Sequence, residues 1–77
     1  MHFLASAVAW EATVVNMGHV LRKARRYPEA IKQYHSALAL APSQAGTYAA
    51  LGFTYHLQAR HFQLEFSIFR EYGLLVG

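Results

Sequence analysis

The feature that most constrains this 77-residue chain is an internal repetition at an offset of 34 residues. The corresponding positions are Met17-Gly18 with Leu51-Gly52, Thr13 with Thr47, Leu21 with Tyr55, and Arg26 with Arg60. Periods of 20 to 50 residues are typical of solenoid proteins, in which similar units bury their apolar faces by stacking. The chain is therefore expected to be a short array of like units rather than a domain around one central core.

Apolar residues at spacings of three and four predict helices throughout, and no alternating pattern predicts strands. A helix over residues 11–24 should end before Tyr27-Pro28, because the residue before proline is disfavoured in the helical region. Pro28 is well placed to begin a second helix, which Pro42 ends. A third helix is expected over residues 45–58 and a fourth over residues 62–72.

A 34-residue unit built from two helices resembles the tetratricopeptide repeat, with Glu11 as its first position. The resemblance implies an all-α fold of antiparallel helical hairpins with about two repeats, the second imperfect. It assigns repeat packing to Met17, Gly18, Leu21, Ala30, Tyr34, Ala37, Pro42, Leu51, Gly52 and Tyr55. Gly18 and Ala30 should lie where two helices come closest, since a glycine inside a helix costs about 1 kcal/mol relative to alanine and needs a reason.

Four segments follow from this alignment. Residues 1–10 are expected to be the end of a preceding helix or a disordered lead, because the apolar start lacks the basic region of a secretory signal. Residues 11–44 form the first repeat, residues 45–61 the first helix of the second, and residues 62–77 a divergent C-terminal helix. Leu64 and Glu71 occupy positions that should be small, so a truncated or alternatively spliced end is the hypothesis for that segment.

One stretch resembles a particular family more closely, the anaphase-promoting complex subunit of the cell-division-cycle-sixteen type. The matching residues are Trp10, Glu11, Asn16, Gly18, His19, Arg22, Lys23, Tyr27, Thr47, Gly52, Tyr55 and His56. The chain departs from that pattern at Ala12, where proline is usual, and throughout residues 62–77. The resemblance implies part of a structural subunit of a cell-cycle ubiquitin ligase, whose repeats form a superhelix that dimerises and holds small accessory subunits.

Composition argues against most other functions. The chain has no cysteine and no aspartate, and His56 and His61 are five residues apart, so neither a metal site nor a cofactor is expected. No serine lies in a nucleophile motif and no glycine-rich phosphate loop is present, so an enzyme is not expected. The basic cluster from Arg22 to Arg26 is interpreted as a solvated helix end rather than a nucleic-acid site. No apolar run reaches the roughly 20 residues of a membrane span.

Stacked first helices create a concave groove, which is the remaining candidate site. Its expected lining residues are Val15, His19, Arg22, Ala49, Phe53 and His56, with Ala12 and Gly46 beside them. Such a groove suits an extended or helical apolar peptide, and the alternative is that these residues pack against a neighbouring repeat. Val15 and His19 stand where some chaperone-binding relatives carry the lysine and asparagine of a carboxylate clamp, so that subtype is disfavoured.

The sequence thus predicts a protein–protein interaction scaffold related to the anaphase-promoting complex, located in the nucleus, the cytoplasm or both. The alternative is a stand-alone peptide-binding adaptor of the co-chaperone or trafficking type. Expected partners are ubiquitin-ligase subunits or peptide tails. A hydrophobic content of 55% and fewer than two good repeats also predict a homo-oligomer or a borrowed partner.

Overall fold

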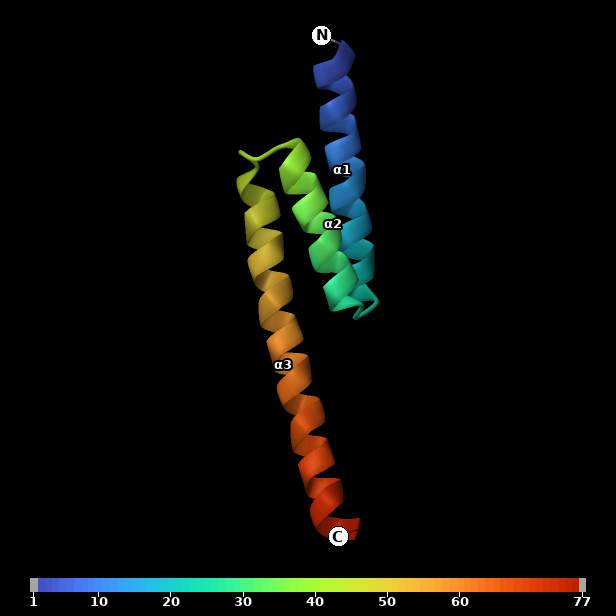
Figure 1. The fold of residues 1–77 in the computed structure, drawn as a ribbon, viewed down its shortest axis with the longest axis vertical. Coiled ribbons are helices and arrows are strands. Elements are labelled where there is room, and N and C mark those ends of the chain that lie inside the picture. The colour runs from blue at the N-terminus through green and yellow to red at the C-terminus, as the bar shows by residue number, and fades with distance from the viewer. Residues whose placement is uncertain (1, 77) are drawn as a thin grey trace.

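A computed structural model describes residues 2–76 as three α-helices joined by two short turns (Figure 1). Helix α1 spans His2–Lys23, α2 spans Tyr27–Leu40 and α3 spans Ala45–Val76. No strand occurs within residues 2–76. The prediction of an all-α, tetratricopeptide-like fold is therefore confirmed.

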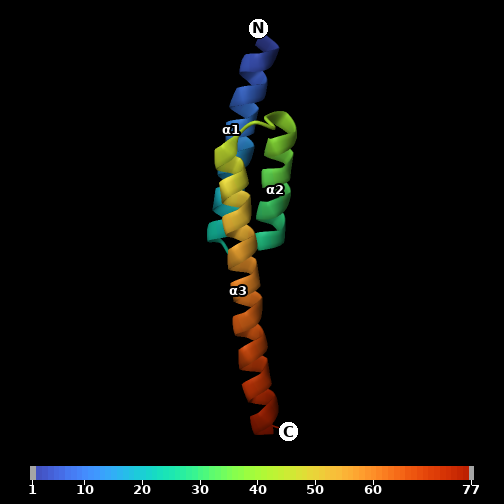
Figure 2. The ribbon, with the colours of Figure 1, turned by 90° about the vertical axis from the view of Figure 1, so that its left-hand side faces the viewer.

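Helix α2 is the central element, because it packs against both α1 and α3. It runs antiparallel to each of them, so the chain makes two successive hairpins (Figures 1 and 2). Helix α3 continues far past the end of the α1–α2 hairpin, and the molecule measures 64 × 17 × 14 Å. The structure is therefore a three-helix bundle, with α2 to one side of α1 and α3 (Figure 2), and with α3 projecting beyond the other two.

The core lies on both faces of α2. Ala30, Tyr34 and Ala37 are completely buried, and Leu51 reaches them from α3. Thr54, also on α3, is buried too, and its hydroxyl donates a hydrogen bond of 2.7 Å to the carbonyl of Ala50. Small residues on α2 let the helices approach closely, and Tyr34 fills the remaining space.

Two expectations about helix ends are wrong. The predicted third and fourth helices are one continuous helix, α3, because residues 53–72 contain neither glycine nor proline to interrupt it. Residues 2–10 do not form a separate lead, since α1 begins at His2 and runs through Glu11 without a break. Met1 and Gly77 lie outside the described residues. The division into repeat units at residues 11–44, 45–61 and 62–77 stays a prediction.

The turn between α1 and α2 is closed by a pair of backbone hydrogen bonds. The N–H of Arg26 donates to the carbonyl of Leu21, and the N–H of Arg25 donates to that of Arg22, each at 2.9 Å. This pairing is the Schellman motif, whose left-handed residue is usually glycine. Here that residue is Arg25, with φ of 64°. The side chain at this position therefore strains the turn.

Replacing Arg25 by glycine should stabilise the protein by about 0.5–1 kcal/mol, because glycine adopts the left-handed conformation without a steric penalty. Urea unfolding at fixed protein concentration measures the change in free energy of unfolding. Ala24→Gly is the control, since Ala24 has no positive φ and glycine there should only destabilise. Equal effects of the two glycines would contradict this account of the turn.

Candidate protein-interaction groove

Gly18 on α1 is the position at which α1 and α2 pack closely in the first hairpin. It is buried, and a Cβ atom built on it would lie 2.6 Å from Cε1 of Tyr34. The ring of Tyr34 thus rests directly on the α1 backbone. Its hydroxyl is joined to Nδ1 of His19 by a hydrogen bond of 2.7 Å, and the two rings lie 5.5 Å apart. One aromatic side chain therefore fixes both the spacing of the helices and the position of His19.

Gly18→Ala should destabilise the protein by about 1–3 kcal/mol, the usual penalty for overpacking a core. Tyr34 is completely buried, so its ring moves aside only by displacing the residues packed around it. Gly52 is the matched control, because it occupies the same repeat position on α3 and has nothing within 4 Å. In dilute solution Gly52→Ala should gain about 1 kcal/mol from helix propensity. Thermal unfolding of the two variants would refute the argument if both moved in the same direction.

The electrostatic environment of His19 favours its neutral form. Burial lowers the pKa of His19 below the usual 6.5, and the positive charges of Arg22 and Lys23 lower it further. The unfolded chain, in which these influences are lost, therefore binds the proton more readily than the folded one. The neutral ring, hydrogen-bonded to Tyr34, is the state that the fold holds near pH 7.

Stability should consequently decrease as the pH falls below about 6.5, because the unfolded state takes up the His19 proton first. The contribution is fully present above that pH and is lost as the pH falls through the folded-state pKa. His19→Gln keeps a polar side chain near Tyr34 but does not titrate, so its decrease between pH 7.5 and 5.5 should be smaller. Unfolding curves at the two pH values test this, and equal decreases in both proteins would contradict it.

A shallow groove lies between α1 and the start of α3. It has a volume of about 320 Å³. Its lining residues are Glu11, Ala12, Val15, Asn16, His19, Gln44, Gly46 and Thr47. The hydroxyl of Thr47 donates a hydrogen bond of 3.4 Å to Oε1 of Glu11, which ties the two walls together. The lining is mixed in character, with carboxylate, amide and imidazole groups around small apolar side chains, so it can offer hydrogen bonds to a peptide backbone.

The structure gathers some of the predicted groove residues and separates others. Val15 and His19 line the groove. The Arg22 guanidinium lies 5.4 Å from the ring centroid of Phe53, a cation–π contact joining α1 to α3. Ala49 is exposed on α3 outside the lining, and His56 borders a separate hollow with Ala59, Arg60 and Gln63.

Sequence reasoning missed several groove residues, all of them polar. Glu11, Asn16, Gln44 and Thr47 were not expected to line it. The recurrence of Thr13 as Thr47 marked the latter as a repeat position, but nothing in the pattern indicated its contact with Glu11. That contact depends on the short turn before α3, which brings Thr47 beside the middle of α1.

The residues assigned to repeat packing also divide into two groups. Gly18, Ala30, Tyr34 and Ala37 are buried, Leu51 is 9% exposed and Leu21 is partly buried. The others are exposed in this chain: Met17, Pro42, Gly52 and Tyr55. For Met17 and Gly52 the expected packing is not made, because α2 covers one side of α1 and of α3 and no described helix covers the other. Tyr55 contacts α2 at its hydroxyl, which lies 3.4 Å from Nε2 of His35. Pro42 simply follows the end of α2.

Within the residues that the structure describes, no three histidine, aspartate or glutamate side chains gather closely enough to hold a metal ion. None of the helices, over their described lengths, combines the length and apolar character needed to cross a bilayer.

Comparison with known proteins identifies the class. A family model described as TPR repeat matches residues 18–58, which is more than half of the chain. The chain therefore belongs to the tetratricopeptide repeat family, as its period and its helical hairpins predict. Proteins of this class are interaction scaffolds, and the chain has that general role. No solved structure matches it significantly.

Particular relatives are similar to part of the chain. Anaphase-promoting complex subunit 6 of Dictyostelium discoideum is 44% identical over 55 residues, which is 71% of this chain and 6% of the relative. The protein of the same name from Arabidopsis thaliana is 50% identical over 50 residues, 65% of this chain and 9% of the relative. The human cell division cycle protein 16 homolog is 44% identical over 48 residues, 62% of this chain and 8% of the relative. The match thus spans less than a tenth of each of these proteins.

Proposed function

We propose that this chain is a non-catalytic segment related to subunit 6 of the anaphase-promoting complex and contacts other subunits of that ubiquitin ligase. The observation that carries the proposal is the identity of 44% to 50% with proteins of that name. Within this chain, the packing of Gly18, His19 and Tyr34 fixes the first hairpin. Nucleus and cytoplasm are the proposed locations.

The groove between α1 and α3 is the proposed contact surface. An extended peptide would lie along its about 320 Å³, with the peptide backbone reaching the Asn16 and Gln44 amides. The Arg22–Phe53 pair continues the same side of the α1–α3 junction and offers a cation and an aromatic face to a side chain. The alternative function, a stand-alone adaptor for peptide tails, would use the same surface with different partners.

Affinity capture with the full 77-residue chain separates the two. Recovery of anaphase-promoting complex subunits, identified by mass spectrometry, supports the proposal, whereas recovery of chaperones or trafficking cargo supports the adaptor. Ala12→Arg should reduce recovery of the specific partners about tenfold or more, because an exposed alanine in the groove is replaced by a long charged side chain.

Ala39→Arg is the matched control. Ala39 is an exposed alanine on α2 outside the groove, so this variant should bind as the unmodified chain does. If both variants bind as the unmodified chain does, the groove is not the contact surface.

A further inference from the structure

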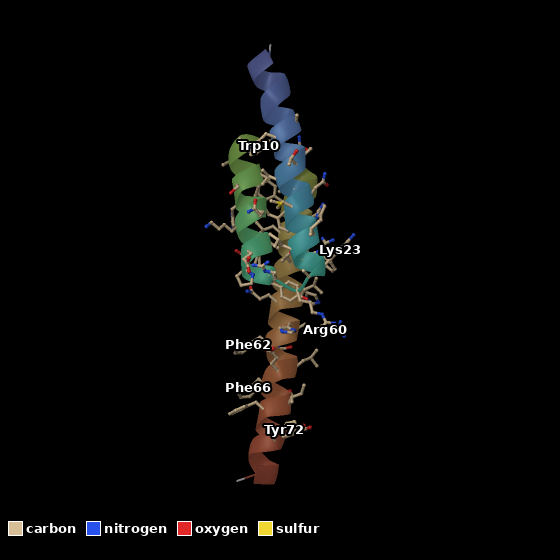
Figure 3. All side chains as sticks on the ribbon, turned by 90° about the vertical axis from the view of Figure 1, so that its right-hand side faces the viewer. Trp10, Lys23, Arg60, Phe62, Phe66 and Tyr72 are labelled. Carbon is tan, nitrogen blue, oxygen red and sulfur yellow. The ribbon has the colours of Figure 1, made fainter. Side chains whose placement is uncertain are left out.

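Helix α3 carries an exposed row of residues that repeats every seven positions. Its large members are Tyr48, Tyr55, Phe62 and Phe69, with exposed fractions of 54%, 47%, 67% and 76%. Between them lie Gly52, Ala59, Phe66 and Gly73, all exposed. We call these eight residues the α3 seam. Phe62 and Phe66 project from the same side of the helix in Figure 3. A seven-residue repeat of this kind is typical of a helix that pairs with another helix.

The equivalent repeat positions on α1, in the first hairpin, are covered by another helix. The residues 34 positions before Tyr48, Gly52 and Tyr55 are Val14, Gly18 and Leu21 on α1. Val14 and Gly18 are buried and Leu21 is partly buried, because α2 packs over them. On α3 the equivalent row is exposed: a Cβ atom on Gly52 would meet nothing within 4 Å, and Tyr55 is 47% exposed although its hydroxyl lies 3.4 Å from Nε2 of His35 on α2. The α3 seam thus has the residue pattern of a helix-covered face, and no helix within residues 2–76 covers it.

We propose that two copies of this chain pair through their α3 seams, with the helices antiparallel, so that α3 of each copy covers the seam of the other. The seam is complementary to itself in one register. When Ala59 faces Phe62 of the second copy, Gly52 faces Phe69 of the second copy. In the same register Gly73 faces Tyr48 and Tyr55 faces Phe66. All eight seam residues then find a partner, and three of the four layers set a ring against a glycine or an alanine.

Charge supports this register over the next one. If the register is shifted by one heptad toward the C-terminus, Glu65 lies opposite Glu65 of the second copy. Two carboxylates then face each other. In the proposed register Glu65 lies beside Gln58 of the second copy instead. The pairing therefore brings no like charges together along the edges of the seam.

The area available is sufficient for a stable interface. The exposed fractions of the five aromatic side chains of the seam add up to about three fully exposed side chains. These residues are Tyr48, Tyr55, Phe62, Phe66 and Phe69. At about 200 Å² each, this amounts to roughly 600 Å² per copy. Full burial of these side chains in two copies removes about 1,200 Å² from solvent, the lower end of the range for specific protein interfaces.

Sedimentation velocity of the full chain tests the pairing. At about 100 μM the chain should sediment with twice its 8.7 kDa mass. Phe62→Glu should raise the dissociation constant about 30-fold or more, as expected for a central aromatic contact. Leu64→Glu is the matched control, since Leu64 is 56% exposed on α3 but lies outside the seam, and it should leave the mass unchanged.

Gly52→Leu separates association from folding. Leucine favours a helix more than glycine does, so the folded chain should keep its circular dichroism signal, yet its side chain fills the space for Phe69 of the second copy. This variant should therefore be helical and monomeric. A monomeric unmodified chain, a dimeric Gly52→Leu variant, or equal losses in Phe62→Glu and Leu64→Glu would each overturn the proposal.

Distances between spin labels test separately whether the two α3 helices run antiparallel. The chain contains no cysteine, so a spin label attaches only at an introduced one. Labels at Ser43→Cys should lie about 50 Å apart in the dimer, and labels at Arg60→Cys within about 25 Å, from the helical rise of 1.5 Å per residue. Short distances at both positions would indicate parallel helices and overturn the proposal. These results do not depend on which partners the groove binds.

Discussion

The contact between the Tyr34 ring and the Gly18 backbone is the constraint on which the rest of the structure depends. It sets how closely α1 and α2 approach, since any side chain at Gly18 would occupy the space of the ring. Through its hydroxyl the same residue holds the His19 imidazole, which lines the groove. Ala30 and Ala37, one turn away on either side, bring α2 close to its neighbours without adding bulk. The groove is thus positioned by core packing together with the short turn before α3, which places Gln44 and Thr47 beside α1.

The structure also shows why a chain this small has so much exposed apolar surface. Each helix in a repeat array contacts only its neighbours in sequence, so an outer helix keeps one face uncovered until another unit is added. Here α2 is covered on both sides, and α1 and α3 on one each. The phenylalanines beyond residue 61 are exposed because no described part of the chain reaches them. Most contacts between helices join neighbours along the chain, and a predominance of such contacts favours fast folding.

The sequence predicts the first hairpin well and the second poorly, for physical reasons that particular residues illustrate. Gly18, Ala30, Tyr34 and Pro28 are strong local signals, because each excludes most alternatives at its position. Periodicity alone predicts the apolar stripe after Ala59 but not the continuity of α3. A helix boundary needs a glycine, a proline or a capping residue, and between residues 58 and 62 the apolar pattern only weakens. The hydrogen bond between Thr47 and Glu11 joins residues 36 positions apart, so it depends on the orientation of whole helices and leaves no local trace in the sequence.

The uninterrupted length of α3 has a mechanical consequence. From Phe53 beside Arg22 to Tyr72 near the C-terminus, the helix advances about 28 Å at 1.5 Å per residue, without a hinge. Hydrogen bonds along the backbone resist bending, so this stretch acts as a stiff spacer whose direction is set where it leaves α2. A molecule bound near Tyr72 would therefore keep a fixed distance and orientation relative to one bound near Phe53.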